Sequence, residues 1–255
     1  MRELLAYREL AVSFALKDLK VRYKQTFFGV AWAVLQPLLA VLIFSVIFGR
    51  LAGLPTDGIP YPVFVYAGMA IWLYFSSSIT AAAQNLVENR ELVTKVFFPR
   101  LLAPVAAVFP PLVDFGISLV ILGVFLAAYG VPPGPELALL PVWIVAAVLL
   151  ALATGLWLAA LNVKYRDVKQ LLPFLVQVWF FASPVVYSSS ILDGAWRWVF
   201  ALNPVVPLIE GFRWSIAGGP GPGVEGLISL AVGLTVLVTG IAYFRRLEQH
   251  FGDLI

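Results

Sequence analysis

The chain contains no cysteine, a single histidine and little charge, with Asp, Glu, Lys and Arg making up 12% of its 255 residues. Without cysteine it has no disulfide framework, no thiol nucleophile and no thiolate metal site, although this absence says little about redox compartment. The histidine, His250, lies near the charged C-terminus and is interpreted as a solvated tail residue. No catalytic and no metal-binding residue is predicted. Soluble domains carry about twice this charged fraction, so a soluble core is excluded.

A nucleotide-binding loop is also missing from the sequence. Phosphate loops need a glycine-rich turn that ends in Gly-Lys-Ser or Gly-Lys-Thr, because the lysine and the backbone N–H groups hold the phosphates. No such run occurs, and the glycines of 219–223 (GPGPG) are interpreted as a flexible connection. The sequence therefore offers no cradle for ATP.

What the sequence has in abundance is long apolar stretches, with 61% hydrophobic residues and a mean hydropathy of +0.93. A helix needs about 20 apolar residues to cross the hydrocarbon core of a bilayer, and six stretches meet this requirement. The sequence therefore predicts an all-α integral membrane protein with one transmembrane domain over residues 1–255. The predicted spans are Val30–Phe48, Val63–Ala83, Leu101–Tyr129, Leu137–Leu161, Leu171–Tyr187 and Val224–Phe244.

Basic residues set the predicted orientation, because lysine and arginine are retained on the cytoplasmic side of a membrane. Fourteen of the 17 lie before span one, between spans two and three, between spans four and five, or after span six. The opposite side holds only Arg50, Arg197 and Arg213, so both termini are predicted to be cytoplasmic. The net charge of +3 is interpreted as a result of topology. A nucleic-acid partner is not expected, since a protein that binds nucleic acid would cluster its basic residues on one soluble face.

Residues 1–29 precede span one, which is expected to be an anchor and not a signal peptide, because it lacks an Ala-x-Ala type exit. An apolar stripe beside a basic stripe predicts a helix in the cytoplasmic membrane interface, in contact with lipid. A second, narrower apolar stripe indicates packing on protein; the alternative is a solvated basic arm. The first stripe is Val12, Leu16, Leu19 and Tyr23; the second is Leu10, Phe14 and Val21. The residues assigned to the interfacial helix are Lys17, Lys20, Arg22, Tyr23 and Lys24.

The segment between spans two and three, residues 85–100, is predicted to be cytoplasmic and helical as far as Phe97. Glu88, Glu91 and Lys95 recur at helical spacing and form a charged face that protrudes from the membrane. The segment is either an ordinary hairpin between two spans or a lever that docks on a soluble partner. The residue pattern alone does not decide between them.

Residues 188–223, between spans five and six, are too many for a hairpin and too aromatic for a loop. Tryptophan favours the headgroup zone, so two short re-entrant helices are predicted to dip into the outer membrane interface, joined between Asn203 and Pro207. Residues 224–255 then form span six and a cytoplasmic tail. The residues assigned to these outer gate helices are Trp196, Trp198, Asn203, Glu210 and Arg213, of which the last two can pair at i, i+3.

Span three carries Pro104, Pro110 and Pro111, and span one carries Pro37, so kinked or broken helices are expected there. Asp114 is the one acid deep inside an apolar span. A charge at the bilayer centre costs about 2.5 to 3.5 kcal/mol on insertion scales, so Asp114 is expected to be protonated, paired or facing water. Its role is either functional or structural, as a polar contact between helices or as a residue near the membrane edge.

Several strings resemble the ABC-2 type membrane subunits of polysaccharide exporters, which move O-antigen, capsule or teichoic acid chains. Residues 22–38 (RYKQTFFGVAWAVLQPL) resemble the start of that family's first span, and residues 95–101 (KVFFPRL) resemble its turn into the third. Residues 162–187, which include YRDV and FASPV, resemble its fourth loop and fifth span. Asn203-Pro204 and residues 210–213 (EGFR) resemble its outer re-entrant pair. The resemblance covers nearly the whole chain.

The resemblance implies a homodimeric channel in the bacterial inner membrane, bound to two copies of a separate ATPase subunit that carries ATP and Mg. The cargo implied is a lipid-linked polysaccharide, and the chain itself is then a transport subunit and not an enzyme. The resemblance also favours the lever interpretation of the segment between spans two and three. The ATPase-coupling residues implied are Glu88, Asn89, Arg90, Glu91, Thr94 and Lys95.

Aromatic side chains suit a sliding sugar polymer, because their faces make broad, non-directional contacts with the apolar faces of sugar rings. Aromatic residues of spans one and five are the candidates, although packing and lipid contact are the commoner roles of aromatics in membrane proteins. The candidate channel-lining residues are Trp32, Phe44, Phe48, Trp179, Phe180 and Tyr187.

Three alternatives remain on the sequence alone. The first is an ABC-2 permease for a smaller cargo such as a drug or a lipid. The second is an ion-coupled secondary transporter, which needs ionisable groups near the membrane midplane and has only Asp114 to offer. The third is an intramembrane transferase that uses residues 165–169, but no second carboxylate cluster and no histidine accompanies Asp167.

Overall fold

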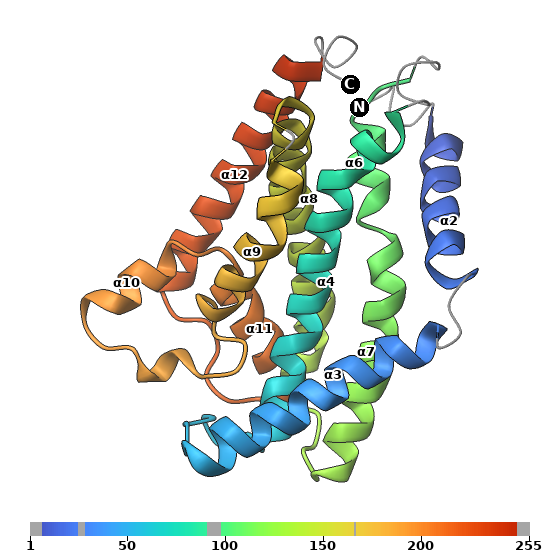
Figure 1. Ribbon diagram of the computed structural model, residues 1–255. Helices are drawn as coiled ribbons and strands as arrows, with labels where there is room; N and C mark the ends of the chain where they lie inside the picture. Colours follow the sequence, from blue (N-terminus) through green and yellow to red (C-terminus); the bar gives the residue numbers. More distant parts are fainter. Residues whose placement is uncertain (1–6, 25–28, 91–97, 166, 249–255) are drawn as a thin grey trace.

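The computed structural model describes residues 7–24, 29–90, 98–165 and 167–248, and the side chains of residues 8, 22–24 and 29–33 lie outside that description. Every regular element in these ranges is a helix (Figure 1). The helices are α2 (Arg8–Lys24), α3 (Gly29–Phe44), η1 (Ser45–Leu51), α4 (Tyr61–Glu88), α6 (Leu102–Ala107), α7 (Pro110–Ala128), η2 (Pro135–Leu139), α8 (Leu140–Lys164), α9 (Val168–Phe181), η3 (Ser189–Ile191), α10 (Ala195–Ala201), α11 (Val205–Ala217) and α12 (Glu225–Glu248).

Five segments in the described part of the chain are long and apolar enough to cross a membrane. They correspond to the predicted spans one to four and six, and they establish a multi-pass membrane protein. The predicted span five corresponds to α9, which has 14 residues and is shorter than the other five. The five segments are Val34–Leu51, Tyr61–Glu88, Leu102–Ala128, Pro135–Lys164 and Glu225–Glu248.

Helix α4 forms the centre of the bundle, where α7, α8, α9 and α11 surround it (Figure 1). Its most hydrophobic window is 83% buried, whereas the other four candidate spans are 11 to 22% buried. Small residues allow the closest packing, because a Cβ at Gly155 of α8 would lie 2.7 Å from the Ala82 side chain of α4. The other spans therefore present most of their apolar surface outward, as expected for helices that face lipid or a second subunit.

Helix α2 runs alongside the bundle and packs on α6 and α7 (Figure 1). Phe14 is 4% exposed and contacts Phe98 with a ring-centroid distance of 5.6 Å, while Leu10 is partly buried against the same cluster. The prediction that the second stripe packs on protein is confirmed for these two residues. It is wrong for Val21, which is 68% exposed. The first stripe faces outward at Val12 and Leu16.

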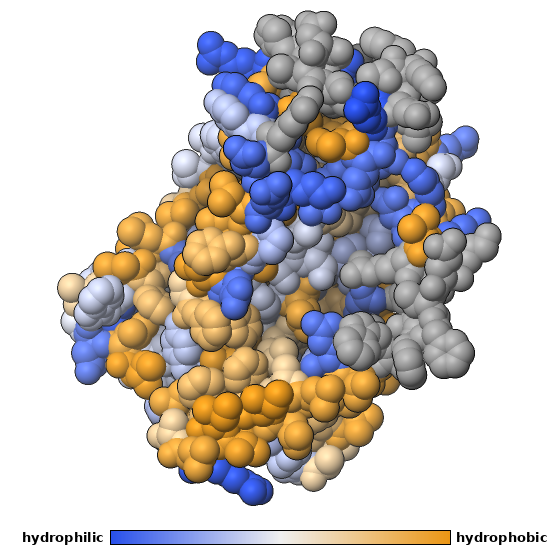
Figure 2. All heavy atoms as spheres, viewed as in Figure 1, coloured by the Kyte–Doolittle hydropathy of each residue, from blue (hydrophilic) through white to orange (hydrophobic). Residues whose placement is uncertain are grey.

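The predicted span one falls on α3 and η1, which cross the other helices obliquely at the end of the bundle away from α6 (Figure 1). Pro37 lies inside α3, and a turn of π-helix continues α3 from Ser45 to Leu51. One apolar face is open, with Leu39, Leu42 and Ile43 between 46 and 63% exposed. Figure 2 shows this face as a continuous hydrophobic surface, whereas hydrophilic residues gather at the opposite end of the bundle.

The predicted break in span three is confirmed. Helix α6 ends at Ala107 and α7 begins at Pro110, with Val108 and Phe109 between them. Pro110 and Pro111 lack the N–H groups that a continuous helix would need, so the break falls directly before them.

Two short helices, α10 and α11, lie between α9 and α12, joined by Leu202, Asn203 and Pro204. Their number and their joint agree with the prediction for residues 188–223. Pro204 is the N-cap of α11, and the proline ring fixes φ at a value that suits the start of a helix.

Candidate functional site

The cytoplasmic lever predicted between spans two and three starts where α4 ends. Glu88 is the last residue of α4, and Asn89 caps it by donating its backbone N–H and its side-chain Nδ2 to the Asn85 carbonyl at 3.0 and 2.9 Å. Arg90 follows and is exposed. The remaining predicted coupling residues, Glu91, Thr94 and Lys95, lie outside the described residues.

Helix α2 is attached to this end of α4 by two side-chain contacts. Lys17 Nζ donates to Asn89 Oδ1 at 2.6 Å, and Asn85 Nδ2 donates to Asp18 Oδ2 at 3.1 Å. Burial raises the pKa of the Asp18 carboxyl, and the charge of Lys17 and the Asn85 hydrogen bond oppose that rise. Both Lys17 and Lys20 are exposed, and Lys17 reaches α4 through its hydrogen bond to Asn89. The side chains of the other interfacial-helix residues, Arg22, Tyr23 and Lys24, are not described.

The other side of the same end is held by α12. The backbone N–H of Arg100 donates to Glu248 Oε1, and Arg100 Nη1 donates to the Glu248 carbonyl, both at 2.8 Å. Arg100 belongs to the string KVFFPRL that resembles the family's turn into span three. The residues on both sides of segment 91–97 are therefore anchored to the bundle, one by α2 and the other by α12.

The structure brings four of the predicted channel-lining aromatics together. Phe44 stacks on Phe48 and Phe180 with centroid distances of 5.8 and 6.0 Å, and Phe180 and Trp179 both lie against Trp72 of α4 at 5.8 and 6.4 Å. This aromatic seam joins α3, α4 and α9. Tyr187 lies elsewhere, donates its hydroxyl to the Phe181 carbonyl at 2.9 Å and contacts Phe200. The side chain of Trp32 is outside the described part.

Asn203 connects the seam to the outer helix pair. Its Oδ1 accepts from Trp179 Nε1 at 2.9 Å and from the Val205 backbone N–H at 3.1 Å. Its Nδ2 donates to the Ala182 carbonyl at 3.1 Å and to Ser183 Oγ at 3.0 Å. One amide thus fixes the end of α9, the turn into α11 and the ring orientation of Trp179.

Sequence reasoning missed one surface of α9. Gln170, Phe174, Gln177 and Phe181 are all exposed and recur at intervals of 4, 3 and 4, so they form a single stripe. Phe174 is 63% exposed and Phe181 is 56% exposed. The helical spacing of two amides and two phenylalanines was the signal that could have found it. We name these four residues the α9 stripe.

Arg213 is the buried polar centre of the outer half, with 5% of its surface exposed. Its Nη2 donates to the Pro184 and Val185 carbonyls at 2.8 and 3.1 Å, and its Nε donates to the Phe64 carbonyl at 3.2 Å. The guanidinium also lies 3.6 Å from the Phe64 ring centroid, which allows a cation–π contact. Burial lowers the pKa of Arg213 to about 10, so it stays charged at neutral pH.

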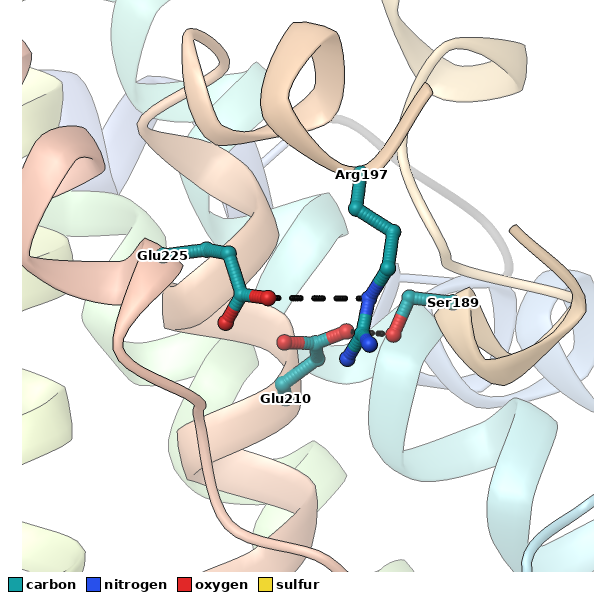
Figure 3. A network of polar contacts seen from close by, with 4 residues as sticks. All are labelled: Ser189, Arg197, Glu210 and Glu225. Carbon is teal, nitrogen blue, oxygen red and sulfur yellow. Dashed lines mark hydrogen bonds and ion pairs between the residues drawn. The ribbon is translucent and has the colours of Figure 1, made fainter. Parts of the chain in front are cut away.

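The predicted pair of Glu210 with Arg213 is not a direct contact. Glu210 Oε1 accepts a hydrogen bond from Ser189, and Arg213 is engaged by carbonyls (Figure 3). Burial raises the pKa of the Glu210 carboxyl, and the Ser189 hydrogen bond and the Arg213 charge oppose that rise. Close by, Arg197 Nε lies 3.6 Å from Glu225 Oε1 and reaches down from α10 toward Glu210 (Figure 3). The predicted gate residues Trp196 and Trp198 are 65 and 55% exposed.

Asp114 lies in the first turns of α7, half-buried, and Ser118 Oγ donates to its backbone carbonyl at 3.0 Å. In the ranges that the structure describes, no group of three or more His, Cys, Asp or Glu side chains could hold a metal ion. The arrangement supplies an aromatic seam, an exposed stripe of amides and rings, and two anchored residues, Asn89 and Arg100, on either side of segment 91–97.

These features define a multi-pass helical membrane protein built around one buried helix, with polar clusters at both ends of its bundle. The chain belongs to the ABC-2 type transporter family, whose profile matches residues 11–217. Members of this family are transport components.

Three similar proteins cover almost the whole chain. The O-antigen export system permease protein RfbA of Myxococcus xanthus is 33% identical over an alignment of 259 positions, which covers 100% of this chain and 98% of that protein. RfbA of Klebsiella pneumoniae is 26% identical over 97% of this chain and 95% of its own length. The polysialic acid transport protein KpsM of Escherichia coli is 25% identical, with 92% of each chain covered.

Proposed function

We propose that this chain is the permease subunit of an ABC exporter that moves a lipid-linked polysaccharide, such as O-antigen, across the bacterial inner membrane. The observation that carries the proposal is the 33% identity to an O-antigen export permease over the full length of both chains. A separate ATPase subunit, present in two copies, binds ATP and Mg and supplies the energy. The absence of a Gly-Lys-Ser/Thr run from the sequence supports this division of labour.

The permease works as a homodimer. Helices α3 and α9 each leave an apolar face open. Helix α9 has 14 residues, fewer than the roughly 20 that a lipid-facing span needs, so a second subunit is the better partner for its open face. Two copies that meet along these faces would enclose the path of the polymer between their α9 stripes. Rings and amides on this path give sugars broad contacts and exchangeable hydrogen bonds, and no strong site that would trap them.

The conformational change driven by ATP hydrolysis is transmitted to the pore through residues 88–95. The ATPase contacts the charged face of this segment, with Glu88, Arg90, Glu91 and Lys95 as the coupling groups. Because Asn89 and Arg100 attach its two ends to α2 and α12, a push on the segment moves these helices with α4 and opens the path.

The topology we propose has six crossings, with both termini in the cytoplasm. Helix α9 makes the fifth crossing, and α10 and α11 dip into the outer interface as a re-entrant pair. Helix α2 lies at the cytoplasmic interface, with Lys20 free to meet anionic headgroups. The distribution of lysine and arginine between the two sides supports this orientation.

A cysteine-free chain makes the topology directly testable. Lys169 is exposed in the first turn of α9 and Trp196 is exposed in α10, beyond the other end of α9, so single substitutions Lys169→Cys and Trp196→Cys report on the fifth crossing. In intact spheroplasts, a membrane-impermeant maleimide is expected to label Trp196→Cys and to leave Lys169→Cys unlabelled until the cells are opened. Labelling of both from outside would show that α9 does not cross.

The side chains of the α9 stripe are expected to increase the rate of export. Replacing Phe174 and Phe181 together by alanine should reduce export roughly tenfold, because two ring contacts of about 0.5 to 1.5 kcal/mol each are lost from the path. Folding should be unchanged, because both rings are exposed. The matched control is Val120→Ala on α7, which is 71% exposed and lies on a different helix. The rate is measured as polysaccharide reaching the outer side per unit time, and equal rates for both variants would contradict the assignment.

The function itself is tested by deleting the gene and locating the polysaccharide. We expect full-length glycan on its lipid carrier to accumulate on the cytoplasmic side and surface glycan to disappear. Expression of the intact chain should restore both. Normal glycan at the surface, together with loss of a drug or lipid efflux activity, would identify the permease for a smaller cargo instead.

A further inference from the structure

A polar chamber of about 170 Å³ opens among η3, α10, α11 and the start of α12. Its charged lining consists of Asp57, Arg197, Glu210, Arg213 and Glu225. Arg213 is committed to the Phe64, Pro184 and Val185 carbonyls, so Arg197 is the arginine whose guanidinium reaches into the chamber (Figure 3). The chamber thus holds the Arg197 guanidinium, paired with Glu225, among three carboxyl groups.

An apolar groove of about 360 Å³ lies next to it, between α8, α11 and α12. Leucine side chains from all three helices line it, including Leu149, Leu208 and Leu230. Trp143 of α8 also lines this groove.

The chamber and the groove adjoin each other, because Pro207, Gly223, Gly226 and Ser229 line both. At Gly226 a Cβ would make ordinary contacts of 3.6 Å with the side chains of Pro207 and Pro222, so the junction has room for a methyl group there. A polar chamber of mixed charge that adjoins an apolar groove fits a molecule with a charged head and a hydrocarbon tail.

The charged residues of the chamber determine which lipid head group fits it. A phosphate matches Arg197, and a primary ammonium group matches Glu210 and Glu225, which flank that guanidinium (Figure 3). We propose that the chamber and groove bind one bilayer phospholipid with an ethanolamine head and an acyl chain in the groove. The lining of the chamber and groove includes no residue of α9, so the site is separate from the polymer path proposed along the α9 stripe. The bound lipid holds α11 against α12 and steadies the outer helix pair.

Lipid binding is tested by native mass spectrometry on the full chain purified with its ATPase partner, titrated with phosphatidylethanolamine, phosphatidylcholine and phosphatidylglycerol. We expect one phosphatidylethanolamine per protomer to survive delipidation. It should bind roughly tenfold better than phosphatidylcholine, which cannot donate N–H hydrogen bonds to the carboxylates. Equal retention of all three lipids would mean an unspecific annular layer and would overturn the proposal.

Substitutions separate the parts of the site. Gly226→Leu fills the junction and is expected to reduce retained lipid at least fivefold, whereas Gly226→Ala, whose Cβ makes ordinary contacts, is the matched control. Arg197→Gln should abolish the preference among headgroups while leaving the groove intact. Unchanged retention in Gly226→Leu, with the protein still folded by thermal unfolding, would show that the lipid binds elsewhere.

Discussion

Replacing Arg213 by methionine is expected to destabilise the protein by roughly 3 kcal/mol or more. The methionine fills a similar volume but leaves the carbonyls of Pro184 and Val185 without their charged donor, and each hydrogen bond to a charged group contributes about 1.5 to 3 kcal/mol. The contact with the Phe64 ring is lost as well. The measurement is thermal unfolding of the purified chain in one detergent.

Two further variants test whether the loss of stability is specific to the Arg213 guanidinium. Arg197→Met removes an arginine whose side chain is 59% exposed and should cost less than about 1 kcal/mol. Arg213→Lys keeps the charge but cannot present a planar fork to three carbonyls, so its stability should fall between those of Arg213→Met and the unchanged chain. Equal stability of Arg213→Met and Arg197→Met would contradict the role of Arg213 as the buried anchor of the outer half.

Reversing the charges of the segment between α4 and α6 is expected to stop export without unfolding the permease. Glu91→Arg and Lys95→Glu each replace an attraction to the ATPase by a repulsion, and like charges across an interface cost several kcal/mol. Export should fall tenfold or more. The variants are measured for surface polysaccharide and for ATPase subunit that co-purifies.

The matched control is Arg246→Glu, an exposed charge reversal on the last turn of α12 at the same end of the bundle. It should leave export within about twofold of normal, because it lies outside the coupling segment. Normal export by Glu91→Arg and Lys95→Glu, with normal amounts of protein in the membrane, would exclude this segment as the lever.

Local sequence features predicted much of the fold. The break between α6 and α7 follows from Pro110 and Pro111, because prolines remove helix hydrogen bonds wherever the chain folds. The turn between α10 and α11 follows in the same way from Asn203-Pro204. Such features depend on neighbouring residues only, so one sequence suffices to read them.

Contacts between distant segments could not be predicted. Arg213 was expected to pair with Glu210 one turn away, but the carbonyls of Phe64, Pro184 and Val185 reach it because Gly68 lets the chain approach α4. A Cβ at Gly68 would lie 2.5 Å from the Val185 carbonyl oxygen. Hydropathy likewise showed that α3 is apolar, but its oblique path follows from packing against other helices (Figure 1).

For the aromatic candidates, the sequence predicted which spans carry them but not which rings are exposed. Composition predicted aromatic side chains on spans one and five, and Phe44, Phe180 and Trp179 do come together. Which rings are exposed depends on helix rotation, which one sequence does not report. Phe174 and Phe181 were therefore overlooked although they are the exposed phenylalanines of α9.

The central claim is that a separate ATPase drives polysaccharide export through this permease. The most direct measurement is purification of the tagged chain from gently solubilised native membranes, followed by reconstitution into vesicles with lipid-linked glycan. The account predicts that a nucleotide-binding subunit co-purifies in equal amounts and that glycan moves across the bilayer only with ATP and without vanadate. A chain that purifies alone, and glycan that stays where it was loaded when ATP is added, would contradict it.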